Sequence, residues 1–91
     1  MKLKKLLEII ENRRRKMPEG SYVASLFKFG EDRIIQKIGE EATEVVIASK
    51  NKNKNRIISE VTDLLFHLMV LLVSKNITFS DIEKELDNRN K

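Results

Sequence analysis

The sequence contains no cysteine, so its fold does not depend on disulfides and any metal site in it lacks thiolate ligands. One proline and three glycines are too few for the many turns of an all-β fold. Tryptophan is absent, and the four phenylalanines and one tyrosine do not form the interleaved aromatic platform of a nucleic-acid-binding surface. These scarcities favour a single all-α domain over residues 1–91.

Long hydrophobic runs are also missing. The most apolar stretch, Leu64 to Val73, is interrupted by His67 and is shorter than the ~20 residues that a membrane-spanning helix needs. The first five residues, MKLKK, do not begin a signal peptide. We therefore expect a cytoplasmic protein with no membrane partner. The net charge of +4 fits a polyanionic partner, which can be nucleic acid, a phosphorylated substrate or a membrane surface. Without the aromatic platform, the charge by itself gives nucleic acid little support.

Apolar residues recur at helical spacing along most of the chain, between lysine, glutamate and asparagine. The pattern predicts a bundle of four main helices and one short helical segment, over residues 2–16, 21–30, 32–50, 56–75 and 80–88. Residues 17–20 (MPEG) break the first helix, and residues 51–55 (NKNKN) form a polar connection.

Several residues are candidates for helix ends. Ser21 is expected to cap the short segment, which Gly30 ends, and Asp32 is expected to cap the long helix that follows. Asn76 can end the fourth helix. The sequence Ser80-Asp-Ile-Glu83 matches a capping box that opens the last one.

The helix over residues 56–75 is apolar around nearly its whole circumference, which is typical of a helix buried on all sides. The exception is a narrow strip that carries Glu60, Asp63 and His67. A core this apolar in so short a chain predicts a partner subunit, and we expect the bundle to be completed by dimerisation as a homodimer.

Two pairs of acidic residues have the same spacing: Glu41 with Glu44, and Glu60 with Asp63. Residues three apart lie on one face of a helix, so two adjacent helices would bring four carboxylates together. Such a cluster repels itself unless a cation binds it, and oxygen ligands favour Mg²⁺, with Mn²⁺ as a possible substitute. An alternative is that the first pair, with Glu40, lies on a solvated helix face and is paired with Lys37.

Other residues near the acidic pairs have two interpretations. His67 is more often a satisfied core residue than a ligand, although it can also orient Asp63 or a water by a hydrogen bond. Gly39 is costly inside a helix, which indicates close approach by a ligand or by another backbone. For the basic run that begins at Arg13, a role at the helix C-terminus is favoured over a ligand role. The candidate phosphate contacts are Lys37, Lys50 and Arg13.

The segments Lys37 to Lys50 (KIGEEATEVVIASK) and Glu60 to Leu72 (EVTDLLFHLMVLL) resemble the phosphoribosyl-ATP pyrophosphatase family, the second enzyme of histidine biosynthesis. Upstream, residues 18–22 (PEGSY) and the residues Leu26, Phe29, Gly30 and Asp32 also match. The paired acids alone are shared with the wider all-α nucleotide pyrophosphohydrolases, which include MazG-like and dimeric dUTPase enzymes. Val61, Thr62 and Phe66 depart slightly from the family pattern, and no carboxylate is changed.

The resemblance implies Mg²⁺-dependent hydrolysis of 1-(5-phosphoribosyl)-ATP to 1-(5-phosphoribosyl)-AMP and pyrophosphate, by a homodimer. It implies that Glu41, Glu44, Glu60 and Asp63 are the metal ligands and catalytic residues, with Glu40 as a neighbouring or added ligand. Which carboxylate acts as general base stays open. The alternatives are a related NTP or dNTP pyrophosphohydrolase, a di-iron bundle, and a basic helical module that binds nucleic acid.

Overall fold

The structure is a computed structural model that describes residues 1–90. Within these residues it contains five helices and no strand. They are α1 (Leu3–Lys16), α2 (Tyr22–Phe29), α3 (Glu31–Lys50), α4 (Lys54–Ser74) and α5 (Phe79–Arg89). The prediction of an all-α fold with four main helices and one short helix is confirmed, the short one being the eight residues of α2.

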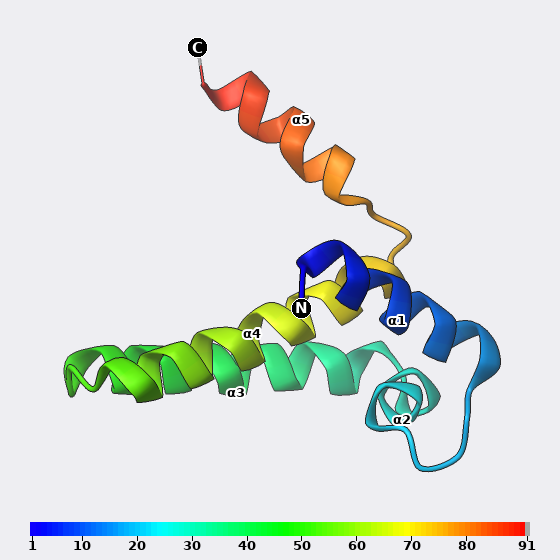
Figure 1. Ribbon diagram of the computed structural model, residues 1–91, viewed down its shortest axis with the longest axis horizontal. Coiled ribbons are helices and arrows are strands. Elements are labelled where there is room, and N and C mark those ends of the chain that lie inside the picture. Colours follow the sequence, from blue (N-terminus) through cyan, green and yellow to red (C-terminus); the bar gives the residue numbers. More distant parts are fainter. Residues whose placement is uncertain (91) are drawn as a thin grey trace.

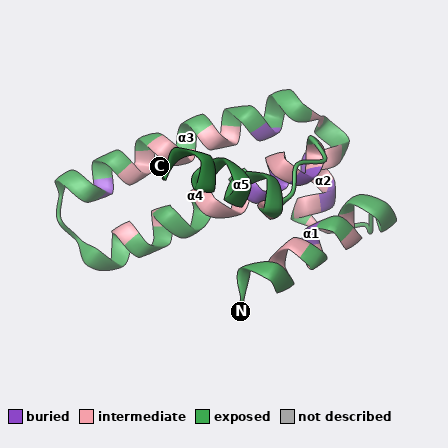
Figure 2. Cartoon of the chain, turned by 90° about the horizontal axis from the view of Figure 1, so that it is seen from above, coloured by how far each residue is buried: buried purple, intermediate pink, exposed green. Residues whose placement is uncertain are grey.

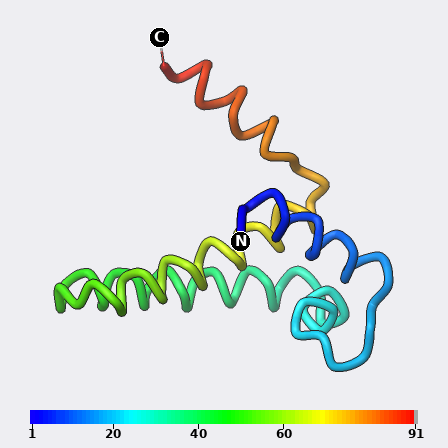
Figure 3. The backbone as a smooth tube through the Cα atoms, viewed as in Figure 1, coloured from blue at the N-terminus to red at the C-terminus, as the bar shows by residue number. Residues whose placement is uncertain are grey.

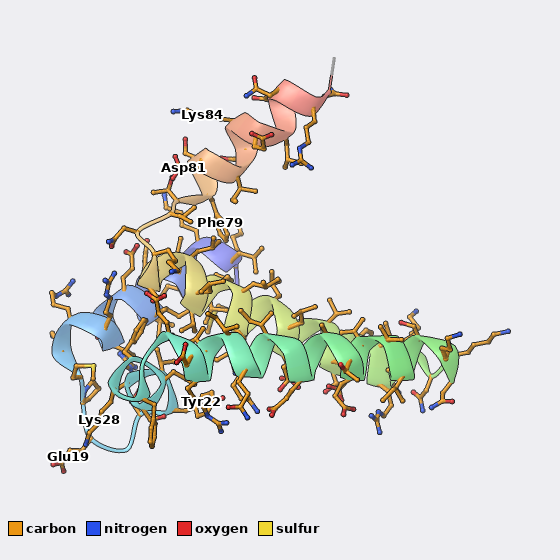
Figure 4. All side chains as sticks on the ribbon, turned by 180° about the vertical axis from the view of Figure 1, so that it is seen from behind. Glu19, Tyr22, Lys28, Phe79, Asp81 and Lys84 are labelled. Atoms are coloured by element: carbon orange, nitrogen blue, oxygen red, sulfur yellow. The ribbon has the colours of Figure 1, made fainter. Side chains whose placement is uncertain are left out.

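The long helices α3 and α4 lie side by side and form a hairpin (Figure 1). Helix α1 packs on α4, and α2 contacts both α1 and the beginning of α3. Helix α5 projects away from this body, and the backbone trace shows its last turn farthest from the other helices (Figure 3). Phe79 lies at the end of α5 nearest the body, and Lys84 lies further out (Figure 4). The chain thus has a packed body and an arm.

The hydrophobic core lies at one end of the hairpin, where α1, α2, α3 and α4 meet (Figure 2). Its members are Ile10, Leu26, Ile34, Met69, Val70 and Val73. The residues come from all four helices, as expected when amphipathic helices bury their apolar faces against one another. At the opposite end of the hairpin, α3 and α4 pack only against each other among the described helices.

The structure confirms the helix ends predicted at Ser21 and Gly30. The Ser21 hydroxyl accepts a hydrogen bond from the Ala24 N–H at 3.1 Å, and Gly30 follows α2 with a φ of 100°, which glycine adopts without strain. The prediction that Asp32 caps the next helix is wrong. Gly30 is the N-cap of α3, and Asp32 lies in the first turn, where an acidic side chain complements the helix dipole.

Two other boundaries differ from prediction. The connection after α3 is shorter than residues 51–55, because Asn53 caps α4 by accepting the Arg56 N–H at 3.1 Å. The last helix begins before Ser80: Thr78 is its N-cap and forms the capping box with Asp81. Thr78 and Asp81 have the same spacing as the predicted pair, and the extended backbone of Thr78 decides between them. The end of α4 is close to prediction, since Lys75 is its C-cap.

Helix α4 is not buried on all sides within one chain, which corrects the prediction from its composition. Ile58, Val61 and Leu68 are exposed on it. By length and composition alone α4 could also cross a membrane, and core helices of soluble proteins can be as long and as apolar. In this chain α4 packs against α3 and α1, and 22% of its apolar stretch is buried.

Candidate metal centre

Three carboxylates from the two helices of the hairpin converge. Glu41 on α3 and Glu60 and Asp63 on α4 each offer one oxygen, and these oxygens lie within 4.8 Å of one another. Glu60 and Asp63 point the same way because they are three residues apart on one helix, and the packing of α3 on α4 brings Glu41 opposite to them. The structure therefore brings together three of the four predicted ligands from residues about 20 positions apart.

The chemistry of this set fits a small divalent cation. All the donors are carboxylate oxygens, which Mg²⁺ and Mn²⁺ prefer. Adjacent oxygens around Mg²⁺ are about 3 Å apart and opposite ones about 4 Å apart, so small side-chain movements would complete the coordination. Glu41 and Glu60 are partly buried and Asp63 is exposed, so the cluster opens to solvent on one side. Three carboxylates can hold the ion and leave other positions for water or phosphate oxygens.

Glu44 lies beside the three-carboxylate cluster and is paired with a cation from this chain. Its Oε2 is 3.7 Å from Nη2 of Arg56, and the same nitrogen lies 3.5 Å from Oε1 of Glu60. Arg56 thus bridges α3 and α4 at the edge of the cluster. Arg56 is not among the residues predicted for this site, although its i,i+4 spacing from Glu60 is a signal that the sequence contains.

Lys37 lies against the other side of the cluster. Its Nζ is 3.3 Å from Glu40 Oε1 and 3.6 Å from Glu41 Oε1, as the solvated-face alternative expected for Glu40. Burial by itself lowers the pKa of Lys37, but the hydrogen bond with Glu40 and the charges of Tyr22, Glu40 and Glu41 outweigh burial and raise it. Lys37 is therefore a firmly charged group beside the carboxylate cluster.

Glu40 points outward from the cluster. Its Oε2 accepts a hydrogen bond from Gln36 at 3.1 Å, and hydrogen bonds from Gln36 and then Lys37 lower the pKa of its carboxyl group. The side chain is exposed. Glu40 can reach the ion only by leaving these partners, so a direct ligand role has less structural support than one for Glu41.

His67 is buried and fully hydrogen-bonded, which agrees with its interpretation as a satisfied core residue. Its Nδ1 lies 2.8 Å from the backbone oxygen of Asp63, and its Nε2 lies 2.8 Å from the hydroxyl of Tyr22. The predicted link to Asp63 exists, but it is made to the backbone and not to the carboxylate. Tyr22 was noted in the sequence only as part of the family pattern, and nothing in the local spacing connects it with His67.

Three other predicted residues are not brought to the cluster. A Cβ added at Gly39 meets nothing within 4 Å, so no other backbone of the described chain approaches it there. Lys50 lies nine residues beyond Glu41, or about 13 Å along the helix axis. Arg13 on α1 hydrogen-bonds Asn12. Within residues 1–90, no ion pair connects Arg13 or Lys50 with any of the clustered acids.

Comparison with known proteins gives one family. The family model described as phosphoribosyl-ATP pyrophosphohydrolase matches residues 3–90. A protein named phosphoribosyl-ATP pyrophosphatase from Bacillus cytotoxicus is 54% identical over 96% of this chain and 81% of its own length. The protein of the same name from Leptospira biflexa is 52% identical over 96% of this chain and 95% of its own length. The histidine biosynthesis bifunctional protein HisIE from Caldanaerobacter subterraneus is 58% identical, and the chain spans 43% of that protein.

Proposed function

The chain belongs to the phosphoribosyl-ATP pyrophosphohydrolase family, and from this premise we propose that it hydrolyses 1-(5-phosphoribosyl)-ATP to 1-(5-phosphoribosyl)-AMP and pyrophosphate in a Mg²⁺-dependent reaction of histidine biosynthesis. The observation that carries the metal dependence is the convergence of Glu41, Glu60 and Asp63. Three negative charges this close repel one another; Lys37 and Arg56 offset part of that charge, and an ion shared with substrate phosphates would offset the rest.

In this proposal Glu41, Glu60 and Asp63 hold the ion, and Glu44 becomes a fourth ligand when it leaves Arg56. A bound Mg²⁺ supplies neutralisation of charge at the phosphoric anhydride and a site for an activated water. Freed from Glu44, the Arg56 guanidinium can pair with a phosphate, for which its planar fork of donors is suited. The chain thereby exchanges an internal ion pair for one with the substrate.

Lys37 is proposed to contact the phosphates from the α3 side of the site. Its ammonium already lies within 4 Å of Glu40 and Glu41 and carries a raised pKa, so it stays charged at neutral pH. A carboxylate oxygen that does not bind the ion accepts the proton of the attacking water. The net result is addition of water across the anhydride between the nucleotide and pyrophosphate parts of the substrate.

The proposed enzyme is a cytoplasmic homodimer that acts on a small phosphorylated nucleotide. Support for the dimer comes from the stripe formed by Ile58, Val61 and Leu68 on α4, whose spacing places them on one side of the helix. Exposed apolar stripes of this kind are typical of surfaces that a second subunit covers. No function in binding nucleic acid or a membrane is proposed.

The decisive experiment measures pyrophosphate release from phosphoribosyl-ATP and from a panel of NTPs and dNTPs, each with and without Mg²⁺. The proposal expects turnover of phosphoribosyl-ATP that disappears when EDTA removes the metal. Preference for dUTP or dCTP would assign the chain to the related nucleotide pyrophosphohydrolases instead. Turnover that persists in EDTA would contradict the metal-dependent mechanism while leaving the substrate assignment intact.

A further inference from the structure

His67 is the one polar side chain among the described residues that is buried, with 4% of its surface exposed. It lies on the strip of α4 that carries Glu60 and Asp63, and both its ring nitrogens have partners. One partner is the Asp63 backbone oxygen and the other is the Tyr22 hydroxyl, contributed by α2 from 45 residues away. A buried imidazole connected in this way links α2 to the turn of α4 that carries Asp63.

The two partners determine where the protons lie. The backbone oxygen of Asp63 can only accept, so Nδ1 of His67 must carry a hydrogen and donate it. In the neutral ring Nε2 is then an acceptor, and the Tyr22 hydroxyl donates to it. The result is a hydrogen-bonded chain in one direction, from Tyr22 through His67 to Asp63. In the amide ladder of α4 the same carbonyl accepts the His67 backbone N–H, so the ring adds a second donor to it.

We propose that Tyr22 and His67 are positioning residues, which hold the backbone of Asp63 and thereby aim its carboxylate at the ion. This inference rests on the metal-dependent function proposed above. Metal sites tolerate little displacement of their ligands, and residues outside the coordination sphere orient those ligands through hydrogen bonds. Here the support reaches the ligand through its main chain, so the whole turn between Asp63 and His67 is held.

Ring packing keeps the chain of hydrogen bonds in place. The Tyr22 ring lies 6.2 Å from the Phe66 ring at 25° and 5.9 Å from the His67 ring at 86°. The Phe66 and His67 rings are 5.1 Å apart at 83°. Such stacked and edge-to-face contacts fix the planes of the rings. Tyr22 follows Ser21, whose side chain caps α2, so its backbone is fixed as well. Removal of the Tyr22 hydroxyl should therefore break the hydrogen bond and leave the packing intact.

The tautomer is tested first, in the metal-free wild-type protein. The sequence has one histidine, so a long-range ¹H–¹⁵N correlation spectrum contains a single side-chain imidazole. At about pH 8, where an ordinary histidine is neutral, the spectrum should show the proton on Nδ1 and none on Nε2. A proton on Nε2 would overturn the proposal, because His67 could then not donate to Asp63.

The positioning role is tested by Mn²⁺ binding, followed by electron paramagnetic resonance. Tyr22→Phe removes only the hydroxyl that orients His67 and should weaken Mn²⁺ binding about 10-fold, the lower end of the effect of changing residues that orient a metal ligand. His67→Asn keeps a donor near the Nδ1 position, whereas His67→Gln keeps a polar group near Nε2. Asn should therefore retain more affinity than Gln.

The matched control is Thr62→Val. Thr62 donates its side-chain hydroxyl to the Ile58 carbonyl at 2.7 Å, one residue before Asp63 but outside the chain of hydrogen bonds. Its loss should leave Mn²⁺ affinity unchanged. One contrary result is that Tyr22→Phe keeps its helical circular dichroism spectrum, melts at a lower temperature and still binds Mn²⁺ as tightly as wild type. That result would show that Tyr22 has only a structural role, and it would overturn the proposal. If Tyr22→Phe does not fold, the Mn²⁺ affinities of the two His67 variants decide. Tighter binding by His67→Asn than by His67→Gln supports the proposal, and the reverse order overturns it.

Failure of the proposed function has a different signature. A wild-type protein that shows the Nδ1 proton and binds no Mn²⁺ would overturn the metal site, and with it the positioning role. A wild-type protein that binds Mn²⁺ and hydrolyses phosphoribosyl-ATP, with Tyr22→Phe unchanged in affinity and in kcat, would overturn the positioning role alone. The expected kinetic effect of Tyr22→Phe is a lower kcat with little change in KM.

Discussion

Nη2 of Arg56 lies 3.5 Å from Oε1 of Glu60, one helical turn away, so a permanent positive charge borders the carboxylate cluster. The guanidinium is half exposed and its attraction to Glu60 and Glu44 is screened by solvent, so it contributes little to stability. The position of the Arg56 charge beside the cluster therefore matters more than its contribution to the free energy of unfolding. The same charge compensates the acids when no ion is bound and competes with a cation that binds them.

Substitution of Arg56 should therefore have opposite effects on metal binding and on catalysis. In Arg56→Gln the cluster loses its competing charge, and we expect Mg²⁺ to bind a few-fold more tightly in the absence of substrate. The kcat/KM for phosphoribosyl-ATP should fall about 10-fold or more, because a charged hydrogen bond to phosphate is lost. Calorimetric titration and steady-state kinetics measure the two effects. Lys54→Gln, on the first turn of α4, is the control; parallel losses of metal affinity and catalysis in Arg56→Gln would contradict the exchange of partners.

Glu41 and Glu44 should not be equivalent, although their sequence positions look alike. Glu41→Gln removes a member of the three-carboxylate cluster and should lower kcat about 10²- to 10³-fold, because a bound metal ion supplies several kcal/mol of charge stabilisation. Glu44→Gln leaves the three-carboxylate cluster intact and should lower kcat only about 10-fold. Circular dichroism should show both variants folded. Equal losses would mean that Glu44 contributes as much to binding the ion as Glu41 does.

The helices can be predicted from the sequence because apolar residues recur in it at helical spacing. The shared face of Glu60 and Asp63 can also be predicted, because residues three apart lie on one side of any α-helix. Helix boundaries depend on which of several neighbouring residues becomes the N-cap. Thr78 caps α5 where Ser80 was predicted, and Gly30 caps α3 where Asp32 was predicted. Contacts between helices are less accessible from one sequence. That Arg56 extends to Glu44 follows from the α3–α4 packing, and no local pattern pairs Tyr22 with His67.

The core where α1, α2, α3 and α4 meet should be sensitive to loss of volume. Ile10 is fully buried between helices, and Ile10→Ala should lower the free energy of unfolding by about 2–5 kcal/mol through lost burial and the cavity left behind. Urea denaturation followed by circular dichroism measures the change. Ile82→Ala on the projecting helix α5, where the side chain is 43% exposed, should change stability much less. Similar losses in the two variants would place α5 in a packed environment in solution.

The exposed stripe on α4 makes the homodimer testable. Ile58 is 55% exposed in one chain, and Ile58→Asp would bury a charge if a second subunit covers it. We expect wild type to sediment as a dimer and Ile58→Asp as a monomer, with its helix content retained. Lys4→Glu, an exposed change in the first turn of α1 where negative charge is favourable, should remain dimeric. A monomeric wild type would contradict the prediction directly.

The capping box at the start of α5 should respond to acid separately from the core. Asp81 accepts the Thr78 N–H at 2.9 Å, and this hydrogen bond, together with the one from the Thr78 side chain, holds the pKa of Asp81 below its ordinary value of 3.8. A pKa that is lower in the folded helix means that the ionised form stabilises α5 above pH 3.8 and that this support is lost as the pH falls through the lower folded value. Since α5 has no buried residue, its amide resonances should shift towards coil values before those of α4 in an acid titration by NMR. Asp81→Asn should fray α5 at neutral pH and remove the transition, whereas Asp87→Asn further along the helix should keep it. Simultaneous acid unfolding of α5 and α4 in wild type would show that the arm is held by contacts other than its cap.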